Sequence, residues 1–226
     1  DAYQLYNTYS IGSDPNGNTT AGQGKTKYDA DVRSELITSW EAGAELKFFN
    51  NRLGVDFAWY KTNAKRQLMN IPLNNLSGYD NMKVNAGNIQ NTGIEIMLNA
   101  RPIETAQFSW DTQLNFSQNK SKIIELLPGK PGMQYALGGS DALQVYAVAG
   151  GAYGEIWGTK YQRVEEGEFK GQLLLNESGL PQATSDKHKI GEQQPDFLLG
   201  WTNTFNYKNF TLSFLIDGRF GGDIFS

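Results

Sequence analysis

The side chains that most often carry out catalysis or bind metals are sparse in this sequence. It has no cysteine, and His188 is its single histidine. A thiolate site, a histidine-rich metal site or a His-based catalytic triad therefore has too few residues to form. His188 stands in the polar run 186–189, which is typical of a solvated loop. We expect no catalytic residue, no bound metal and no cofactor, and we do not predict an enzyme.

One acidic turn has a spacing found in cation sites. Asp14, Asn16 and Asn18 are spaced by two, with Gly17 between the last two, as at the start of a calcium-binding loop. The bidentate acid that such a loop needs later is missing in register. Turns are rich in Asp, Asn and Gly for backbone reasons alone, so a turn is the favoured interpretation and calcium binding the alternative. The glutamates of residues 165–168 are likewise interpreted as a solvated loop.

A second kind of candidate site is aromatic. Aromatic rings can stack on sugar rings, so aromatic residues in polar segments could bind a substrate. The candidates for substrate binding are Tyr79, Tyr146, Tyr153, Trp157 and Tyr161. The alternative is that these rings pack the loops together, which the large burial energy of aromatic side chains favours.

These residues must be positioned by the strands that the sequence predicts. Three pairs of segments alternate between apolar and polar residues, and a short turn joins each pair. The predicted hairpins are 40–48 with 53–60, 93–101 with 108–117, and 197–205 with 210–217. Long polar stretches separate the hairpins. Short turns on one side and long connections on the other are typical of strands that cross a membrane as a β-barrel.

Side chains alternate between the two faces of a strand, so each predicted strand has two distinct faces. One face is apolar apart from Thr112 and Asn203, and its residues predicted to contact lipid are Leu46, Val55, Ile96, Leu98, Leu114, Leu199, Leu212 and Phe214. The other face carries Glu41, Glu45, Lys47, Asp56, Glu95, Arg101, Asp111 and Asp217. In a membrane barrel such a polar face lines the lumen. Its carboxylates would then face water and need no catalytic role.

The alternative fold is a soluble β-sandwich that binds carbohydrate, because sandwich strands alternate in the same way. Sandwich turns usually recur every 8–12 residues, whereas longer intervals separate these hairpins. Aromatic residues also cluster at the strand ends, as in the girdles of outer-membrane barrels. The clusters are Phe48, Phe49, Phe108, Trp110, Phe205, Tyr207 and Phe210 near the turns, and Trp59, Tyr60, Phe116 and Phe197 at the other ends. These features favour the barrel.

Composition excludes two further classes of protein. The chain has 226 residues and a net charge of −4, and without a basic cluster it is not expected to bind nucleic acid. Its uncharged apolar runs are far shorter than the ~20 residues that a membrane-spanning helix needs.

Several short blocks resemble the late barrel of SusC/RagA-type TonB-dependent transporters. They are Ser39-Trp40-Glu41 with Gly43, Phe48-Phe49-Asn50-Asn51-Arg52-Leu53, Asn91-Thr92-Gly93-Ile94-Glu95, Phe108-Ser109-Trp110, Asn115-Phe116-Ser117, Pro195-Asp196-Phe197 and Asp217-Gly218-Arg219-Phe220-Gly221-Gly222. The blocks follow the family's order from about Ser34 to the end. Their ordered combination carries the resemblance, which no single block would.

The resemblance implies an all-β fold, in which antiparallel membrane-spanning strands form part of a large barrel of about 22 strands with a plugged lumen. It implies a place in the outer membrane of Gram-negative bacteria and active import of oligosaccharides or oligopeptides. The implied partners are a SusD-like surface lipoprotein, the TonB complex acting through a plug region, and outer-membrane lipid. We expect residues 1–226 to be a partial barrel, because the plug domain and the closing C-terminal strand are absent from the sequence.

The turn rule also predicts the topology. If the short turns are periplasmic, residues 61–92 and 118–196 lie on the extracellular side with the long loops. The first interval should contain strand extensions above the membrane. The second could be one very long loop or a further hairpin between two loops, with a strand within 147–161. We expect an open arc whose outermost strands pair with segments outside this sequence, because lipid cannot satisfy an unpaired strand edge. A surface adhesin barrel without transport is a further alternative.

Overall fold

The computed structural model describes residues 7–140 and 143–224. Its largest element is an antiparallel sheet in the order β13-β12-β7-β6-β5-β4. The bounds are β4 Leu36–Phe48, β5 Leu53–Pro72, β6 Asn81–Glu104, β7 Phe108–Glu125, β12 Phe197–Tyr207 and β13 Phe210–Phe220. The three predicted hairpins are therefore confirmed, and we call this sheet the wall.

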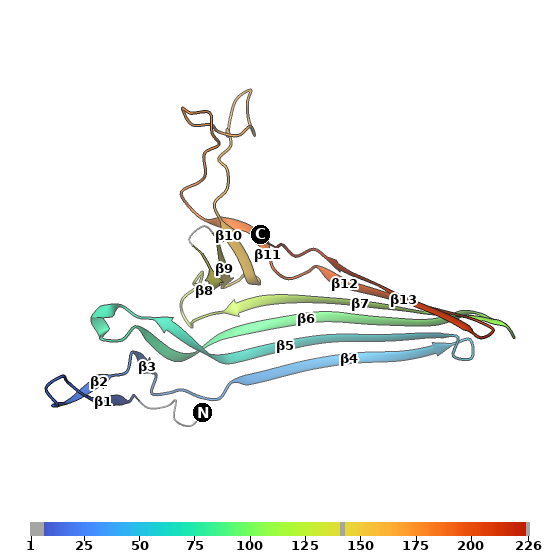
Figure 1. Cartoon of the computed structure of the whole chain (residues 1–226), viewed down its shortest axis with the longest axis horizontal. Coiled ribbons are helices and arrows are strands. Elements are labelled where there is room, and N and C mark those ends of the chain that lie inside the picture. The colour runs from blue at the N-terminus through green and yellow to red at the C-terminus, as the bar shows by residue number, and fades with distance from the viewer. Residues whose placement is uncertain (1–6, 141–142, 225–226) are drawn as a thin grey trace.

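The short turns of the three hairpins lie together at one end of the wall, and the long connections lie at the other (Figure 1). We call these the turn end and the loop end. The first turn contains Phe49, Asn50 and Asn51, all with positive φ, a conformation that asparagine tolerates better than most residues. The last turn has Lys208 with φ 52°.

The strands extend further towards the loop end than the alternation predicted. β5 has 20 residues and β6 has 24, and they remain paired as far as Pro72 with Asn81. At Arg66 (φ 58°) and Gly87 (φ 83°) both strands take a left-handed conformation at the same level. The Asn85 side chain donates hydrogen bonds to the carbonyl oxygens of Arg33 and Arg66 there. These bonds connect the segment that leads into β4 to the left-handed positions of β5 and β6. The predicted strand extensions of 61–92 are confirmed.

The wall is an open sheet, because β4 pairs only with β5 and β13 only with β12 within the described residues. The wall is also a single layer. The buried apolar side chains of the described residues are Val84, Ala86, Ile123, Leu126, Ala147 and Ile156. None of them belongs to the predicted apolar face, which a sandwich would bury against a second sheet. The sandwich alternative is therefore wrong.

The interval between β7 and β12 adds no strand to the wall, because β7 and β12 pair directly. It forms a separate sheet in the order β11-β10-β9-β8. The bounds are β8 Gln134–Gly139, β9 Leu143–Val148, β10 Tyr153–Gly158 and β11 His188–Glu192. The strand expected within 147–161 is thus β10, and the further hairpin in the wall is not found.

Residues 159–187, between β10 and β11, extend as a narrow arm away from the sheets (Figure 1). Isolated bridges such as Tyr161 with Ala183 and Arg163 with Leu173 hold its two sides together. Ile123 and Leu126 at the loop end of β7 form a small core with Ala147 of β9. This core attaches the second sheet to the wall.

The segment before the wall forms β1 Tyr9–Ser13 and β2 Thr19–Gln23, an exposed hairpin, and β3 Thr26–Tyr28. β3 pairs in parallel with the start of β6. A single 3-10 turn, η2 Asn75–Ser77, joins β5 to β6. No helix in residues 7–140 and 143–224 is long and apolar enough to cross a membrane.

Candidate functional site

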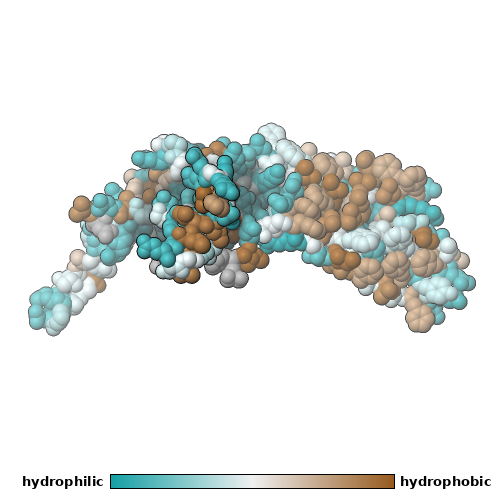
Figure 2. Space-filling view, turned by 90° about the horizontal axis from the view of Figure 1, so that it is seen from above, coloured by the Kyte–Doolittle hydropathy of each residue, from teal (hydrophilic) through white to brown (hydrophobic). Residues whose placement is uncertain are grey.

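The wall has one continuous apolar face, because the strand register aligns the apolar residues of all its strands. One row across the wall contains Leu46, Val55, Leu98, Leu114, Trp201 and Ile216 as successive cross-strand partners. Ile96 and Leu199 lie in the row of Phe116, while Leu212 pairs with Phe205 and Phe214 with Asn203. All eight residues predicted to contact lipid therefore share this face. In Figure 2 apolar side chains gather over the turn-end half of the molecule and polar ones over the loop-end half.

Aromatic rings form two groups on the apolar face. Near the turn end Phe205 stacks with Trp110 at 5.7 Å between ring centroids, and towards the loop end Phe197 stacks with Phe220 at 4.6 Å. Tyr60, which was predicted to belong to the second group, is on the other face. It pairs with Glu41 across the strands, and its ring occupies the space over Gly93.

The two polar residues of the apolar face are covered by indole rings. Asn203 and Thr112 are cross-strand partners. The Trp110 Nε1 donates to Asn203 Oδ1 at 3.0 Å, and the Trp201 Nε1 donates to Thr112 Oγ1 at 2.8 Å. Asn203 is 1% exposed, and its Nδ2 has no partner among the described residues. Two indoles thus shield a polar pair within an apolar surface.

The opposite face of the wall is polar and hollowed. A neighbouring row across all strands reads Glu45, Asp56, Met97, Asn115, Gly200 and Asp217. A hollow of about 670 Å³ is lined there by residues that include Asp56, Glu95, Asn115 and Asp217. The acidic residues Asp56, Glu95 and Asp217 thus line an open hollow, as expected for groups that remain in water.

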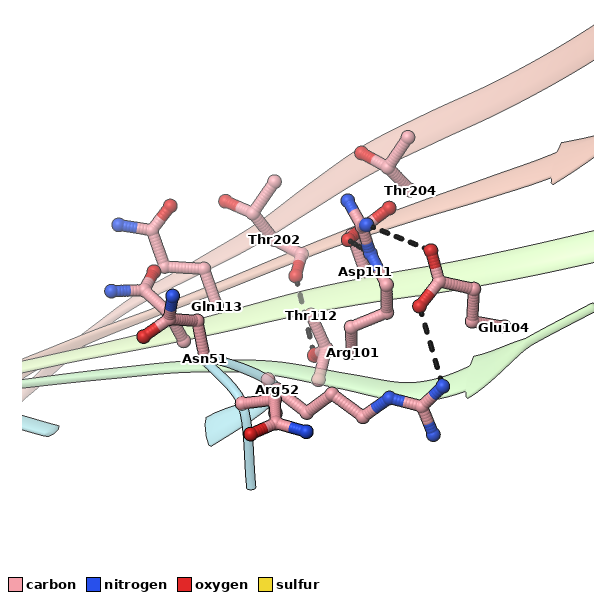
Figure 3. Close-up of a pocket in the computed structure, with 12 residues that line it drawn as sticks. Asn51, Arg52, Arg101, Glu104, Asp111, Thr112, Gln113, Thr202 and Thr204 are labelled. Carbon is pink, nitrogen blue, oxygen red and sulfur yellow. Dashed lines mark hydrogen bonds and ion pairs between the residues drawn. The ribbon is translucent and has the colours of Figure 1, made fainter. Parts of the chain in front are cut away.

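An ion-pair network lies on the polar face at the turn end (Figure 3). The Arg101 Nε donates to Asp111 at 2.6 Å, and its Nη1 is 3.2 Å from Glu104. Glu104 in turn pairs with Arg52 of the first turn at 3.4 Å. The network lines a hollow of about 600 Å³. Arg101 and Asp111 were predicted for this face. The alternation of the strands did not predict that Arg52 and Glu104 would join the network, because both lie at turns.

The five aromatic candidates for substrate binding lie in four different places. Tyr146 of β9 and Trp157 of β10 meet edge to face at 6.2 Å between centroids. Tyr153 of β10 lines a separate hollow between the second sheet and the wall. Tyr161 is in the arm, and Tyr79 lies between η2 and β6. The structure therefore brings only Tyr146 and Trp157 into contact.

A buried carboxylate in the second sheet had no signal in the sequence. Glu155 of β10 is 5% exposed. Its Oε2 accepts a hydrogen bond from the Trp157 Nε1 at 3.0 Å, and its Oε1 pairs with the Lys189 Nζ at 3.1 Å. Lys189 also pairs with Glu192. Burial lowers the pKa of Lys189, but the hydrogen bonds to Glu192 and Glu155 outweigh it, so the pKa lies above its ordinary value. The cluster joins β10 to β11.

The polar motifs weighed as metal sites have local structural roles. Asp14 accepts hydrogen bonds from the backbone amides of Asn16 and Asn18 and from the Asn18 side chain. The Asn18 side chain, followed by its backbone amide, lowers the pKa of Asp14. Its carboxylate thus organises the β1–β2 turn. His188 is exposed but begins β11 rather than standing in a loop. Within the described part of the chain, no three His, Cys, Asp or Glu residues gather as a metal site.

Comparison with known sequences identifies the family. The model of the family described as "TonB dependent receptor-like, beta-barrel" matches residues 1–217. TonB-dependent receptor P3 of Formosa agariphila is 29% identical over 210 residues, which cover 85% of this chain and 21% of that protein. TonB-dependent receptor SusC of Bacteroides thetaiotaomicron is 29% identical over 213 residues, covering 88% of this chain and 21% of SusC. The chain thus spans about a fifth of the length of these relatives.

Solved structures show the same fold. The RagAB peptide transporter superposes with a TM-score of 0.72 at 18% identity, over 95% of this chain and 24% of that one. The RagAB peptide importer in its open-open state gives a TM-score of 0.76 at 16% identity, over 98% of this chain and 24% of that one. The open wall is therefore an arc of such a barrel. The chain belongs to the TonB-dependent receptor-like β-barrel family, and within it the chain resembles receptors of the SusC/RagA type.

Proposed function

We propose that the chain is part of the wall of an outer-membrane, TonB-dependent importer of oligosaccharides or oligopeptides. Membership of the family implies the outer membrane. The single observation that carries the proposal is the pair of neighbouring rows across the wall. The row of Leu46 and Ile216 is apolar throughout, and the row of Glu45 and Asp217 is largely polar. The apolar face then contacts lipid and the polar face lines the lumen.

The partners of the proposed importer follow from its type. A SusD-like surface lipoprotein caps the loop end and helps to capture substrate. The TonB complex supplies energy through a plug region outside residues 1–226. The similarity to SusC and the fold shared with the RagAB peptide transporter support this assignment. The proposal includes both oligosaccharides and oligopeptides as substrate classes, because RagAB is a peptide transporter and aromatic loop residues suit sugars.

The five aromatic candidates differ in how well they could contact such a substrate. Trp157 packs on Tyr146 and donates to Glu155, so its contacts are largely internal. Tyr153 is 40% exposed and Tyr161 is 63% exposed. In the intact protein, Tyr153→Ala and Tyr161→Ala should weaken uptake of a maltooligosaccharide or oligopeptide panel, whereas Tyr207→Ala at the turn end should not. Equal uptake by all three variants would count against a loop-end substrate path.

The membrane placement is tested by two neighbours on one strand. Ile216 is in the apolar row and Leu215 lies opposite Thr202 on the polar face. Both are more than half exposed, at 54% and 61%, so neither substitution disturbs a core. Ile216→Arg should lower the free energy of unfolding in lipid by about 2–4 kcal/mol if it lies near the midplane. Leu215→Arg should have little effect. If both variants fold equally well in lipid vesicles, the proposed placement is wrong.

A further inference from the structure

Four lysines lie on the same side of the wall as the apolar face. They follow directly after its last apolar row, towards the loop end. Lys61 and Lys65 follow Trp59 along β5, and Lys120 and Lys122 follow Phe116 along β7. Each is separated from that aromatic residue by an even number of positions, so each points to the same face as it does. We call these four residues the lysine strip.

The register brings the lysine strip together across the sheet. One row runs Trp40, Lys61, Thr92 and Lys120 through β4, β5, β6 and β7. The next row towards the loop end runs Thr38, Asn63, Gln90 and Lys122, and Lys65 pairs with Asn88 in the row after that. The row on the other side contains Ala42, Trp59 and Ile94. The lysines therefore begin at the boundary of the apolar face.

The spacing of the four lysines lets their ammonium groups contact the same ligand molecules. Lys61 and Lys120 are two strands apart, or about 10 Å, and Lys120 and Lys122 are two residues apart, or about 7 Å. The residues between them are neutral amides and a hydroxyl, namely Asn63, Asn88, Gln90 and Thr92.

The lysine strip also lacks acidic partners within the sheet. Among the described residues, none of the four lysines forms an ion pair, whereas Lys25, Lys47 and Lys189 elsewhere in the chain do. The nearest acid by register is Glu125, which pairs with Asn88 at the loop-end edge. Positive charge is therefore concentrated on this part of the surface.

We propose that the lysine strip binds phosphate groups of lipid headgroups in the outer leaflet. The inference rests on the proposed membrane placement and goes beyond it. Trp40 and Trp59 mark the depth at which indoles meet the headgroups, and the lysines begin at that level. Basic residues next to the apolar surface of a membrane protein attract anionic headgroups. A lipid suits the site better than a free anion, because the strip adjoins the lipid-contacting face and spreads over several strands.

The test compares two fourfold variants of the intact protein. One replaces Lys61, Lys65, Lys120 and Lys122 by Gln, and the other replaces Lys27, Lys130, Lys160 and Lys170 by Gln. Both remove the same charge, and the second set is exposed and outside the wall's apolar face. Each variant is placed in nanodiscs, and binding of bisphosphorylated lipid A is measured by native mass spectrometry against a dephosphorylated lipid A.

The strip variant should bind phosphorylated lipid A at least tenfold more weakly than wild type, with no change for the dephosphorylated lipid. The control variant should match wild type. Unchanged binding by the strip variant overturns the inference, as does displacement of the lipid by millimolar inorganic phosphate, which would indicate a simple anion site. Insertion into the nanodisc is scored separately. Failure of wild type to insert would contradict the proposed function, whereas insertion without phosphate preference contradicts this inference alone.

Discussion

The Trp110 indole donates a hydrogen bond to Asn203 Oδ1 at 3.0 Å across the β7–β12 pair, within an otherwise apolar face. Asn203 is buried although it lies on the outer surface of a single-layer sheet. The surrounding rings provide the cover, since Phe205 stacks on Trp110 and also lies 6.2 Å from Phe214 between centroids. The oxygens of this polar pair accept hydrogen bonds from two indoles rather than from water, while the Asn203 Nδ2 has no partner among the described residues.

The first prediction concerns this pair. Trp110→Phe leaves Asn203 buried without its donor, so we expect a loss of about 1–3 kcal/mol in the free energy of unfolding. Asn203→Leu removes the buried amide but leaves the indole unpaired. The double variant should cost less than the sum of the two single ones, measured by urea unfolding in lipid vesicles. Strict additivity would show that the hydrogen bond does not couple the two residues, and Trp40→Phe, at an exposed position, serves as the control.

A second prediction concerns the space that Gly93 leaves for Tyr60. A Cβ at Gly93 would lie 2.2 Å from the Tyr60 Cζ, so the ring must move. Gly93→Ala should therefore cost about 1–3 kcal/mol and break the 3.4 Å hydrogen bond from the Tyr60 hydroxyl to Asn119. Gly54→Ala is the matched control, because its nearest contact would be 3.8 Å away. Comparable unfolding midpoints for the two variants would contradict this account.

The third prediction concerns the network at the turn end. Asp111→Asn and Glu104→Gln should each change the free energy of unfolding by less than about 1 kcal/mol, because exposed ion pairs contribute little. Arg101 has both acids as partners, so the double variant should free its side chain. A spin label at Thr204, which lines the same hollow, should then report greater mobility nearby. A large stability loss from either single variant would indicate that the network is buried in the intact protein.

The fourth prediction concerns the buried Glu155. Glu155→Gln removes the charge that pairs with Lys189, and we expect a loss of about 1–3 kcal/mol in local stability. Hydrogen exchange should show it as faster exchange of β10 and β11, with β4 to β7 unchanged. Glu165→Gln in the arm is the control, since Glu165 is exposed.

The same cluster predicts a response to high pH. The folded pKa of Lys189 is raised, so its contribution is complete below the ordinary pKa of 10.5 and is lost as the pH rises through the folded value. Protection of β11 from hydrogen exchange, corrected for the intrinsic rate, should therefore fall above about pH 10.5 in wild type. Lys189→Met should remove that pH step. A step of equal size in the variant would assign it to another group.

Local sequence could predict the hairpins because each depends on residues close in the chain. The alternation from Leu53 to Trp59 identifies a strand and its two faces, and Asn50 and Asn51 supply the turn. The alternation by itself does not mark the loop-end extensions of β5 and β6, because Asn85 and Gly87 interrupt the pattern, so these extensions were predicted from the turn rule alone. Local sequence predicted β10 within 147–161 but did not locate β8, β9 and β11, because these short strands depend on the distant core of Ile123 and Ala147.

The sequence by itself determined which residues of each strand share a face, since alternation with a period of two is a property of the extended backbone. The order of several short sequence blocks also indicated the family. The tertiary structure alone decided which residues of different strands meet, because cross-strand register depends on pairing between distant segments. Only that register placed Trp110 on Asn203, joined Glu155 to Lys189 and aligned Lys61 with Lys120.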